Sequence, residues 1–199
     1  DQHKVRFARL NEPDPSYHGV VYVEALGPAA FIGRARVVPL RNTGAAISPF
    51  NSFLILQGIE TLPVRMDRHC ENAVKAAQYL QSHVQVAWVN YPALANSPDK
   101  PLVDKYLGGR GSSILSFGIK GGRDAGAKFI DALQLVTRLV NIGDAKSLAC
   151  HPATTTHRQL SPAELARAGV SEDLVRLSIG IEHIDDILAD LEQALAAAR

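Results

Sequence analysis

Arg176 is the residue whose surroundings most clearly indicate a binding site, because it interrupts the otherwise apolar run Leu174–Gly180. Side chains of a strand alternate between faces, which places Leu174, Arg176 and Ser178 on one face and the branched apolar residues on the other. A buried guanidinium needs an acceptor, and its planar fork fits a carboxylate through two parallel hydrogen bonds. The run therefore predicts a carboxylate site, with an internal salt bridge or a charged strand edge in water as the alternatives.

A second polar cluster lies between residues 141 and 157. The Asn141 amide can donate two protons to a carboxylate oxygen, and the neighbouring Gly143 lets a ligand approach the backbone. Further along, Thr156 stands in a run of hydroxyl residues between His151 and His157. The two histidines could in principle bind zinc, but no third ligand is obvious. The alternative is a polar loop with buried, hydrogen-bonded histidines, and we predict no metal site.

The composition points to an ordinary globular protein. The 21 basic and 20 acidic residues leave a formal net charge of +1, so we expect neither nucleic acid nor a membrane as a partner. Cys70 and Cys150 stand in neither a metal-binding nor a redox spacing, which indicates reduced thiols of a cytoplasmic protein. The glycine pairs at 108–109 and 121–122 lack the lysine of a phosphate-binding loop, and no Ser-His-Asp or Cys-His signature is evident.

The elements that would position these residues alternate between helix and strand. Apolar and β-branched runs predict strands at 86–91, 113–119, 139–142 and 174–179. Periodic apolar residues predict helices at 124–136 and 184–195, and Ser161 with Glu164 forms a capping box at the start of another. The sequence therefore predicts an α/β fold in which a small sheet is covered by helices on one side.

The first third of the chain has a different pattern. Residues 1–19 are rich in proline, aspartate and glycine and indicate an extended arm, followed by a helix over 20–41. Ser48 and Pro49 are typical of a helix start, and Pro63 should kink or restart the helix before the amphipathic segment 67–82. The first residues are polar and lack a starting methionine, so we expect the chain to begin inside a longer protein.

Several of these segments together resemble one family, the O-acetylhomoserine sulfhydrylases. The similar segments are Glu12–Gly19, Ser48–Asn51, Leu56–Leu62, Asn141–Leu148, His151–His157 and Leu174–Glu182. The resemblance covers about residues 11–199. It implies the C-terminal part of a fold-type I transferase that depends on pyridoxal phosphate (PLP). By this resemblance, residues 1–62 would be the end of the large PLP domain with its bridging helix, and residues 63–199 the C-terminal small domain.

The resemblance also implies an activity and its binding residues. Sulfide or a thiol would replace the acetyl group of O-acetyl-L-homoserine to give homocysteine or methionine and acetate, with pyridoxal 5′-phosphate as the electron sink. The family's carboxylate-binding arginine corresponds to Arg176. A polar residue at the position of Asn141 assists it through side chain or backbone, and Thr156 lies near the substrate. Family members are typically homotetramers.

The sequence departs from the family at the catalytic lysine. That lysine stands in a Ser-x-Thr-Lys stretch upstream of the segment matched by Glu12–Gly19, and this sequence holds no such stretch; the nearest candidate, Lys4, lacks the motif. Because Schiff-base chemistry requires the lysine, we expect no catalytic and no cofactor-binding residue in this chain. The N-terminal PLP domain of the same protein would supply them, and the chain would be inactive alone.

Two alternatives share part of this pattern. Methionine γ-lyase and cystathionine γ-synthase or lyase also have the arginine strand, so the chain could be a fragment of one of them. A non-catalytic module that binds amino acids or mediates assembly is an alternative of a different class.

Overall fold

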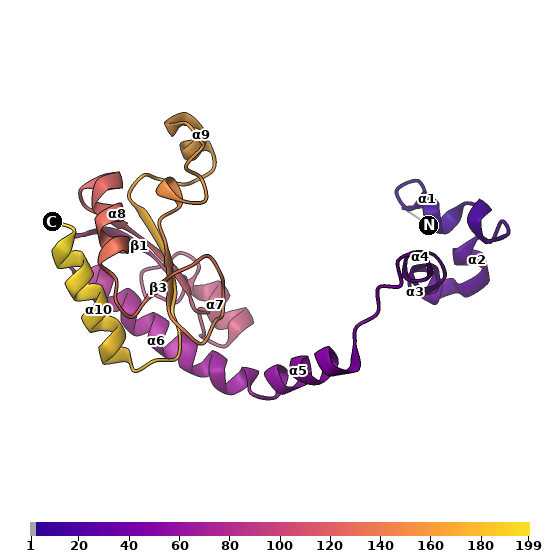
Figure 1. The fold of residues 1–199 in the computed structure, drawn as a ribbon, viewed down its shortest axis with the longest axis horizontal. Helices are drawn as coiled ribbons and strands as arrows, with labels where there is room; N and C mark the ends of the chain where they lie inside the picture. Colours follow the sequence, from indigo (N-terminus) through magenta and orange to yellow (C-terminus); the bar gives the residue numbers. More distant parts are fainter. Residues whose placement is uncertain (1–2) are drawn as a thin grey trace. The chain divides into compact units, whose positions relative to one another are not determined.

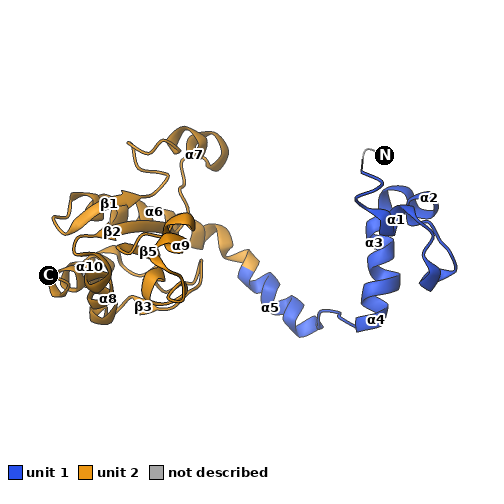
Figure 2. Cartoon of the chain, turned by 90° about the horizontal axis from the view of Figure 1, so that it is seen from above, with its two compact units in different colours: residues 1–58 blue, residues 59–199 orange. Residues whose placement is uncertain are grey.

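The computed structural model describes residues 3–199 and divides into two compact units, 1–58 and 59–199 (Figure 2). The first unit is built of short helical segments. These are α1 (Ala8–Asn11), η1 (Pro15–Tyr17), α2 (Tyr22–Leu26), η2 (Gly27–Ala29), α3 (Ala30–Ala35), η3 (Arg36–Leu40), α4 (Arg41–Thr43) and most of α5 (Pro49–Glu60). Within the described residues 3–199, no helix is long and apolar enough to cross a membrane.

The expectation of an extended arm over residues 1–19 is wrong for most of its length, and residues 1–2 lie outside the described residues. The Asp14 carboxylate accepts hydrogen bonds from the Ser16 amide at 2.9 Å, the Ser16 hydroxyl at 2.6 Å and the buried Tyr22 hydroxyl at 2.9 Å. These bonds lower the pKa of Asp14, and the bond from the Ser16 hydroxyl has the largest effect. Because the Asp14 side chain caps the turn that follows it, residues Pro15–Tyr17 form a helical turn and not an extended segment.

The single helix expected over residues 20–41 is instead interrupted. Gly27 adopts a φ of +52° and is followed by Pro28, so α2 ends there and a new helical segment begins. Pro39 lies inside the π-helical segment η3, where its missing N–H is tolerated by the wider turn. The expected restart at Pro63 is confirmed, because α5 ends at Glu60 and the next helix begins at Leu62.

The second unit contains a five-stranded sheet and its helices. In chain order the elements are α6 (Leu62–Ser82), β1 (Val86–Asn90), α7 (Lys100–Leu107), β2 (Ile114–Ile119), α8 (Gly122–Ala132), β3 (Thr137–Arg138), β4 (Leu148–Cys150), η4 (Pro152–Thr154), α9 (Pro162–Arg167), β5 (Leu174–Ser178) and α10 (Ile184–Ala197). The strand order is β1-β2-β5-β4-β3, and only β3 and β4 run parallel.

Helices α6, α8 and α10 cover one face of this sheet, as predicted (Figure 1). The alternation expected for β5 is confirmed, because Val175, Leu177 and Ile179 are fully buried on the covered face. There they join the Phe117 and Phe129 rings, which pack edge to face with centroids 5.5 Å apart. The opposite side of β5 carries Arg176 and is available for a site.

Two expected elements differ in extent or position, and two others were not expected. The helix begun near residue 124 ends at Ala132 rather than 136, because the Asp190 carboxylate of α10 accepts the backbone N–H groups of residues 134, 135 and 136. The strand expected at 139–142 lies instead at Thr137–Arg138, and Val140 and Ile142 are exposed. Strand β4 and helix α7 were not predicted, the strand because three residues are too few for a period to show.

Candidate functional site

The face of the sheet that lacks helices α6, α8 and α10 borders an open concavity of about 650 Å³. Its walls come from the strands β1, β2, β4 and β5, from the end of α7 and from neighbouring loops. Arg176 and Thr156, two of the three residues that the sequence singled out, line it together with Ser116, Cys150 and Asp99. The structure therefore places both in one cavity, although 20 positions separate them in the sequence.

Arg176 is half-buried and keeps part of its hydrogen-bonding capacity free. One terminal nitrogen, Nη2, donates to the Asn141 carbonyl oxygen at 3.2 Å, while Nε is buried and has no acceptor within the described part of the chain. Nowhere in residues 3–199 does a carboxylate form an ion pair with this guanidinium, so the internal salt bridge is not formed there. A buried donor without an acceptor is costly, which favours a ligand at this point.

The register of the sheet sets three side chains in one row with Arg176. Asn90 pairs with Ser116, Ser116 pairs with Arg176, and Arg176 pairs with Cys150, across β1, β2, β5 and β4. All four line the concavity. Sequence reasoning missed Asn90, Ser116 and Cys150 as neighbours of Arg176, because strand register is set by pairing partners far away in the chain.

Asn141 meets Arg176 through its main chain. Its carbonyl oxygen accepts from the guanidinium, whereas its side-chain Oδ1 accepts from the Ile142 amide at 2.9 Å. The oxygen of this amide is thus engaged with the backbone, whereas the NH₂ group, which the sequence suggested as a carboxylate donor, takes no part in that bond. Thr156 contacts its neighbour, with its hydroxyl 2.8 Å from His157 Nδ1.

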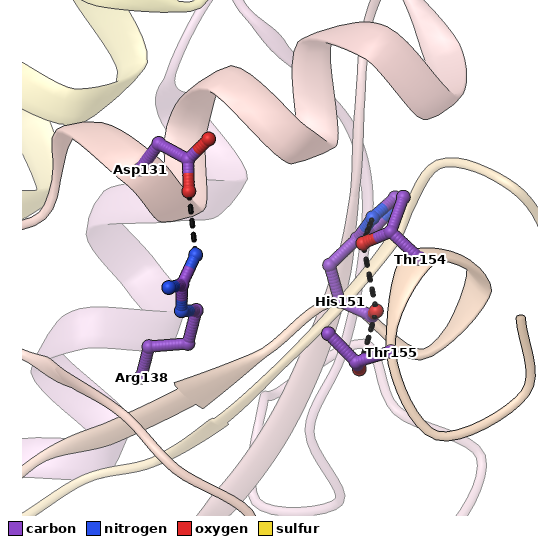
Figure 3. A network of polar contacts seen from close by, with 5 residues as sticks. All are labelled: Asp131, Arg138, His151, Thr154 and Thr155. Carbon is purple, nitrogen blue, oxygen red and sulfur yellow. Dashed lines mark hydrogen bonds and ion pairs between the residues drawn. The ribbon is translucent and has the colours of Figure 1, made fainter.

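His151 fixes the loop that carries Thr156 (Figure 3). Its Nε2 donates to the Glu172 carbonyl at 2.8 Å and its Nδ1 accepts from the Thr154 hydroxyl at 2.9 Å, while the Thr155 hydroxyl donates to the His151 carbonyl at 2.8 Å. Burial lowers the pKa of His151, so the ring is held neutral. Both ring nitrogens are occupied, and residues 3–199 contain no group of three or more potential metal ligands.

Side chains of Arg138, His69 and Asn72 make further contacts that hold strands of the sheet and the segment after β5. Arg138 of β3 pairs with Asp131 of α8 at 2.6 Å, as Figure 3 shows beside the His151 contacts. At the end of β5, His69 Nδ1 donates to the Ile179 carbonyl at 2.6 Å. The Asn72 amide donates to the carbonyls of Gly180 and Glu182 at 3.1 and 2.9 Å. Sequence reasoning missed His69 and Asn72, although their place beside Cys70 and Ala73 on the inward face of a helix was a signal.

With this geometry established, comparison with known proteins identifies the family. The pattern of the Cys/Met metabolism PLP-dependent enzymes matches residues 14–196. The chain belongs to this family. The assignment agrees with the fold and confirms the resemblance seen in the segments around Arg176.

Several curated relatives are named O-acetyl-L-homoserine sulfhydrylase. The chain is 52% identical over 199 residues to an O-acetyl-L-homoserine sulfhydrylase of Leptospira meyeri, covering 96% of this chain and 45% of that protein. It is 49% identical over 191 residues to O-acetyl-L-homoserine sulfhydrylase 1 of Thermus thermophilus, with the same coverages. The chain therefore spans about half the length of the curated relatives it matches.

A solved structure agrees with the fold. An O-acetylhomoserine (thiol)-lyase structure from Campylobacter jejuni superposes with a TM-score of 0.85 at 43% identity, over 96% of this chain and 45% of that chain. That structure carries an N′-pyridoxyl-lysine-5′-monophosphate. The predicted fold class, the C-terminal part of a PLP-dependent transferase, is thus confirmed.

The residues of the concavity do not fit the attachment of PLP, because its covalent bond requires a lysine amine. None of the described residues that line the concavity is a lysine. What they do fit is a carboxylate, through the guanidinium of Arg176 and the neutral polar groups beside it.

Proposed function

We propose that this chain is the C-terminal portion of a PLP-dependent O-acetylhomoserine sulfhydrylase and that it provides the binding site for the substrate α-carboxylate. The observation that carries the proposal is Arg176, which lines a concavity and has no carboxylate partner among residues 3–199. The names of these relatives support the reaction that we propose, the replacement of the acetyl group of O-acetyl-L-homoserine by sulfide or a thiol.

In this proposal, the task of the chain's residues is to bind and orient. The Asn141 carbonyl holds one corner of the guanidinium, so that its remaining N–H groups form a fork for a carboxylate. Thr156 borders the same concavity, where its hydroxyl can contact the bound amino acid. A hydrogen bond to a charged group contributes roughly 1.5–3 kcal/mol, which is sufficient to fix the orientation of a small amino acid.

Helix α5 supports a further polypeptide as partner. Its apolar side chains are exposed around the whole helix, among them Phe50, Phe53, Leu54 and Leu56 at 68%, 55%, 51% and 58%. A helix that is apolar on all sides is normally buried. We propose that the N-terminal PLP domain of the same protein, which carries the lysine, covers it, and that the complete enzyme is a cytoplasmic homotetramer.

Within that enzyme we propose that residues 1–62 end the large domain and include the bridging helix, and that residues 63–199 form the small domain. The cofactor, when bound to the lysine of the large domain, supplies an electron sink for the carbanions of the reaction. The concavity of this chain then faces the reacting amino acid from the carboxylate side.

Coexpression of this chain with a lysine-bearing N-terminal part tests the proposal. The expected result is a yellow protein that forms homocysteine and acetate from O-acetyl-L-homoserine and sulfide, whereas the chain alone forms none. Arg176→Lys keeps the charge but loses the fork, and we expect kcat/KM to fall about 100-fold, which corresponds to about 2.7 kcal/mol.

Other outcomes identify the alternatives. Cleavage of methionine or cystathionine in preference to acetyl replacement would assign the chain to the γ-lyases, and formation of cystathionine from cysteine would assign it to cystathionine γ-synthase. A colourless, inactive complex together with amino-acid binding by the chain alone, lost in Arg176→Ala, would show a non-catalytic binding module and refute the proposal.

A further inference from the structure

Cys150 and Arg176 are direct neighbours on adjacent strands. They lie directly opposite each other in the antiparallel pair β4–β5, and both line the concavity. Cys150 is 4% exposed. Burial raises the pKa of its thiol, and the positive charge of the Arg176 guanidinium lowers it. Cys150 therefore lies beside the guanidinium, within a wall of the same cavity.

The strand neighbours of Arg176 and its hydrogen-bond acceptor are neutral. Ser116 is its partner on the other flank and Asn141 contributes a carbonyl oxygen. Asp99 is the one acidic residue among those described as lining the concavity, and it forms no ion pair with Arg176 within residues 3–199. The guanidinium thus keeps its positive charge uncompensated, with Nε buried and without an acceptor.

A carboxylate at position 150 would change this arrangement. Side chains directly opposite each other in antiparallel strands have Cβ atoms about 4.5–5.5 Å apart, a spacing at which an acidic residue can pair with arginine through two hydrogen bonds. A thiol is only a weak and uncharged acceptor, and the hydrogen bond that it receives from the Arg176 side chain leaves Nε without an acceptor in the described part of the chain.

We propose that Cys150 is a positioning residue for Arg176, because its neutral thiol supports the guanidinium from the sheet side and leaves the fork free for a carboxylate ligand. This inference rests on the proposed function and adds a specificity determinant to it. Burial raises the pKa of the Cys150 thiol, which keeps the group protonated and neutral at neutral pH and agrees with this role.

Two substitutions of nearly equal size test the charge at this position. In the enzyme assembled from this chain and its lysine-bearing part, kcat/KM is measured for O-acetyl-L-homoserine and for its α-carboxamide, and the ratio reports recognition of the carboxylate. General damage to the fold lowers both values and leaves the ratio unchanged. Cys150→Asp should lower the ratio at least about tenfold, because the new carboxylate occupies Arg176. Cys150→Asn should keep the preference for the acid, and Cys70→Ala serves as the control at the other buried cysteine.

Cys150→Ala supplies a second measurement if the aspartate variant does not fold. Loss of the supporting thiol should raise KM for the acid about threefold while kcat stays within about twofold. An unchanged ratio in Cys150→Asp, or an unchanged KM in Cys150→Ala, would overturn the inference. The Arg176→Ala variant distinguishes a failure of this inference from a failure of the proposed function. If it abolishes the acid preference while the Cys150 variants do not, only this inference fails. If it leaves the preference intact, the proposed function fails as well.

Discussion

The Asp190 carboxylate ties the C-terminal helix to the loop before β3, and its removal gives a well-defined prediction. Oδ1 accepts the N–H of Gln134 at 2.9 Å, and Oδ2 accepts those of Leu135 and Val136 at 2.9 and 2.8 Å. Asp190 is 5% exposed, so these backbone groups have little access to water when the carboxylate is lost. The side chain thus stabilises three backbone donors that no helix or strand would satisfy.

The substitution Asp190→Asn replaces one acceptor oxygen by an NH₂ group that faces donors. Hydrogen bonds to a charged group contribute roughly 1.5–3 kcal/mol each, and the asparagine oxygen can retain one or two of the three. We therefore expect the free energy of unfolding to fall by about 3 kcal/mol. For a chain of this size that corresponds to a drop in Tm of about 6–12 °C.

Thermal and urea unfolding of the full chain, followed by circular dichroism, measure this change. Asp186→Asn is the matched control, since Asp186 is an exposed carboxylate in the first turn of the same helix and should contribute only about 0.3–1 kcal/mol through the helix dipole. If Asp190→Asn destabilises the chain no more than Asp186→Asn does, the three hydrogen bonds do not support the loop as described.

Three further measurements follow from contacts of His151, Gly126 and Asn72. Burial lowers the pKa of His151 below its ordinary value of 6.5, so the unfolded chain binds the proton first as the pH falls. The free energy of unfolding should therefore decrease below pH 6.5, by at most about 1.4 kcal/mol per pH unit. Urea unfolding from pH 8 to 5 should show this slope in the native chain and not in His151→Gln. A Cβ at Gly126 would lie 2.5 Å from His151 Nε2, so Gly126→Ala should lower the free energy of unfolding by about 1–3 kcal/mol. A Cβ at Gly58 would meet open space, so Gly58→Ala should stabilise its helix by up to about 1 kcal/mol. Equal Tm values for the two variants would contradict this prediction. Asn72→Ala removes two hydrogen bonds to the carbonyls of Gly180 and Glu182 and should lower Tm by about 4–8 °C. Hydrogen exchange that leaves residues 179–182 as protected as before would show that Asn72 does not hold this segment.

Much of the fold could be predicted because the relevant signals are local. The alternation of Leu174–Ser178 identified both the strand and the face that carries Arg176. The capping box of Ser161 and Glu164 is present as expected, with the Ser161 amide donating to the Glu164 carboxylate at 2.9 Å. Such features depend on residues within a few positions of each other, so periodicity and residue type are sufficient to reveal them.

The features that the sequence did not reveal depend on distant partners. The helix after Gly122 ends at Ala132 because a carboxylate 54 to 56 positions away accepts its following amides. Val140 and Ile142 suggested a strand, yet they are exposed, because the neighbouring strand β4 pairs with Thr137–Arg138 instead. The row of neutral side chains beside Arg176 likewise follows from sheet register, which no local pattern determines.

The bond between Arg176 and Asn141 has a consequence for how position 141 tolerates substitution. The acceptor is a peptide oxygen, and every amino acid places one at that point of the backbone. The support of the guanidinium is therefore insensitive to the identity of the side chain at 141, provided that the loop keeps its path. In the proposed enzyme, assembled with its lysine-bearing part, a library with all twenty amino acids at this codon should yield many active members, whereas one at codon 176 should yield almost none.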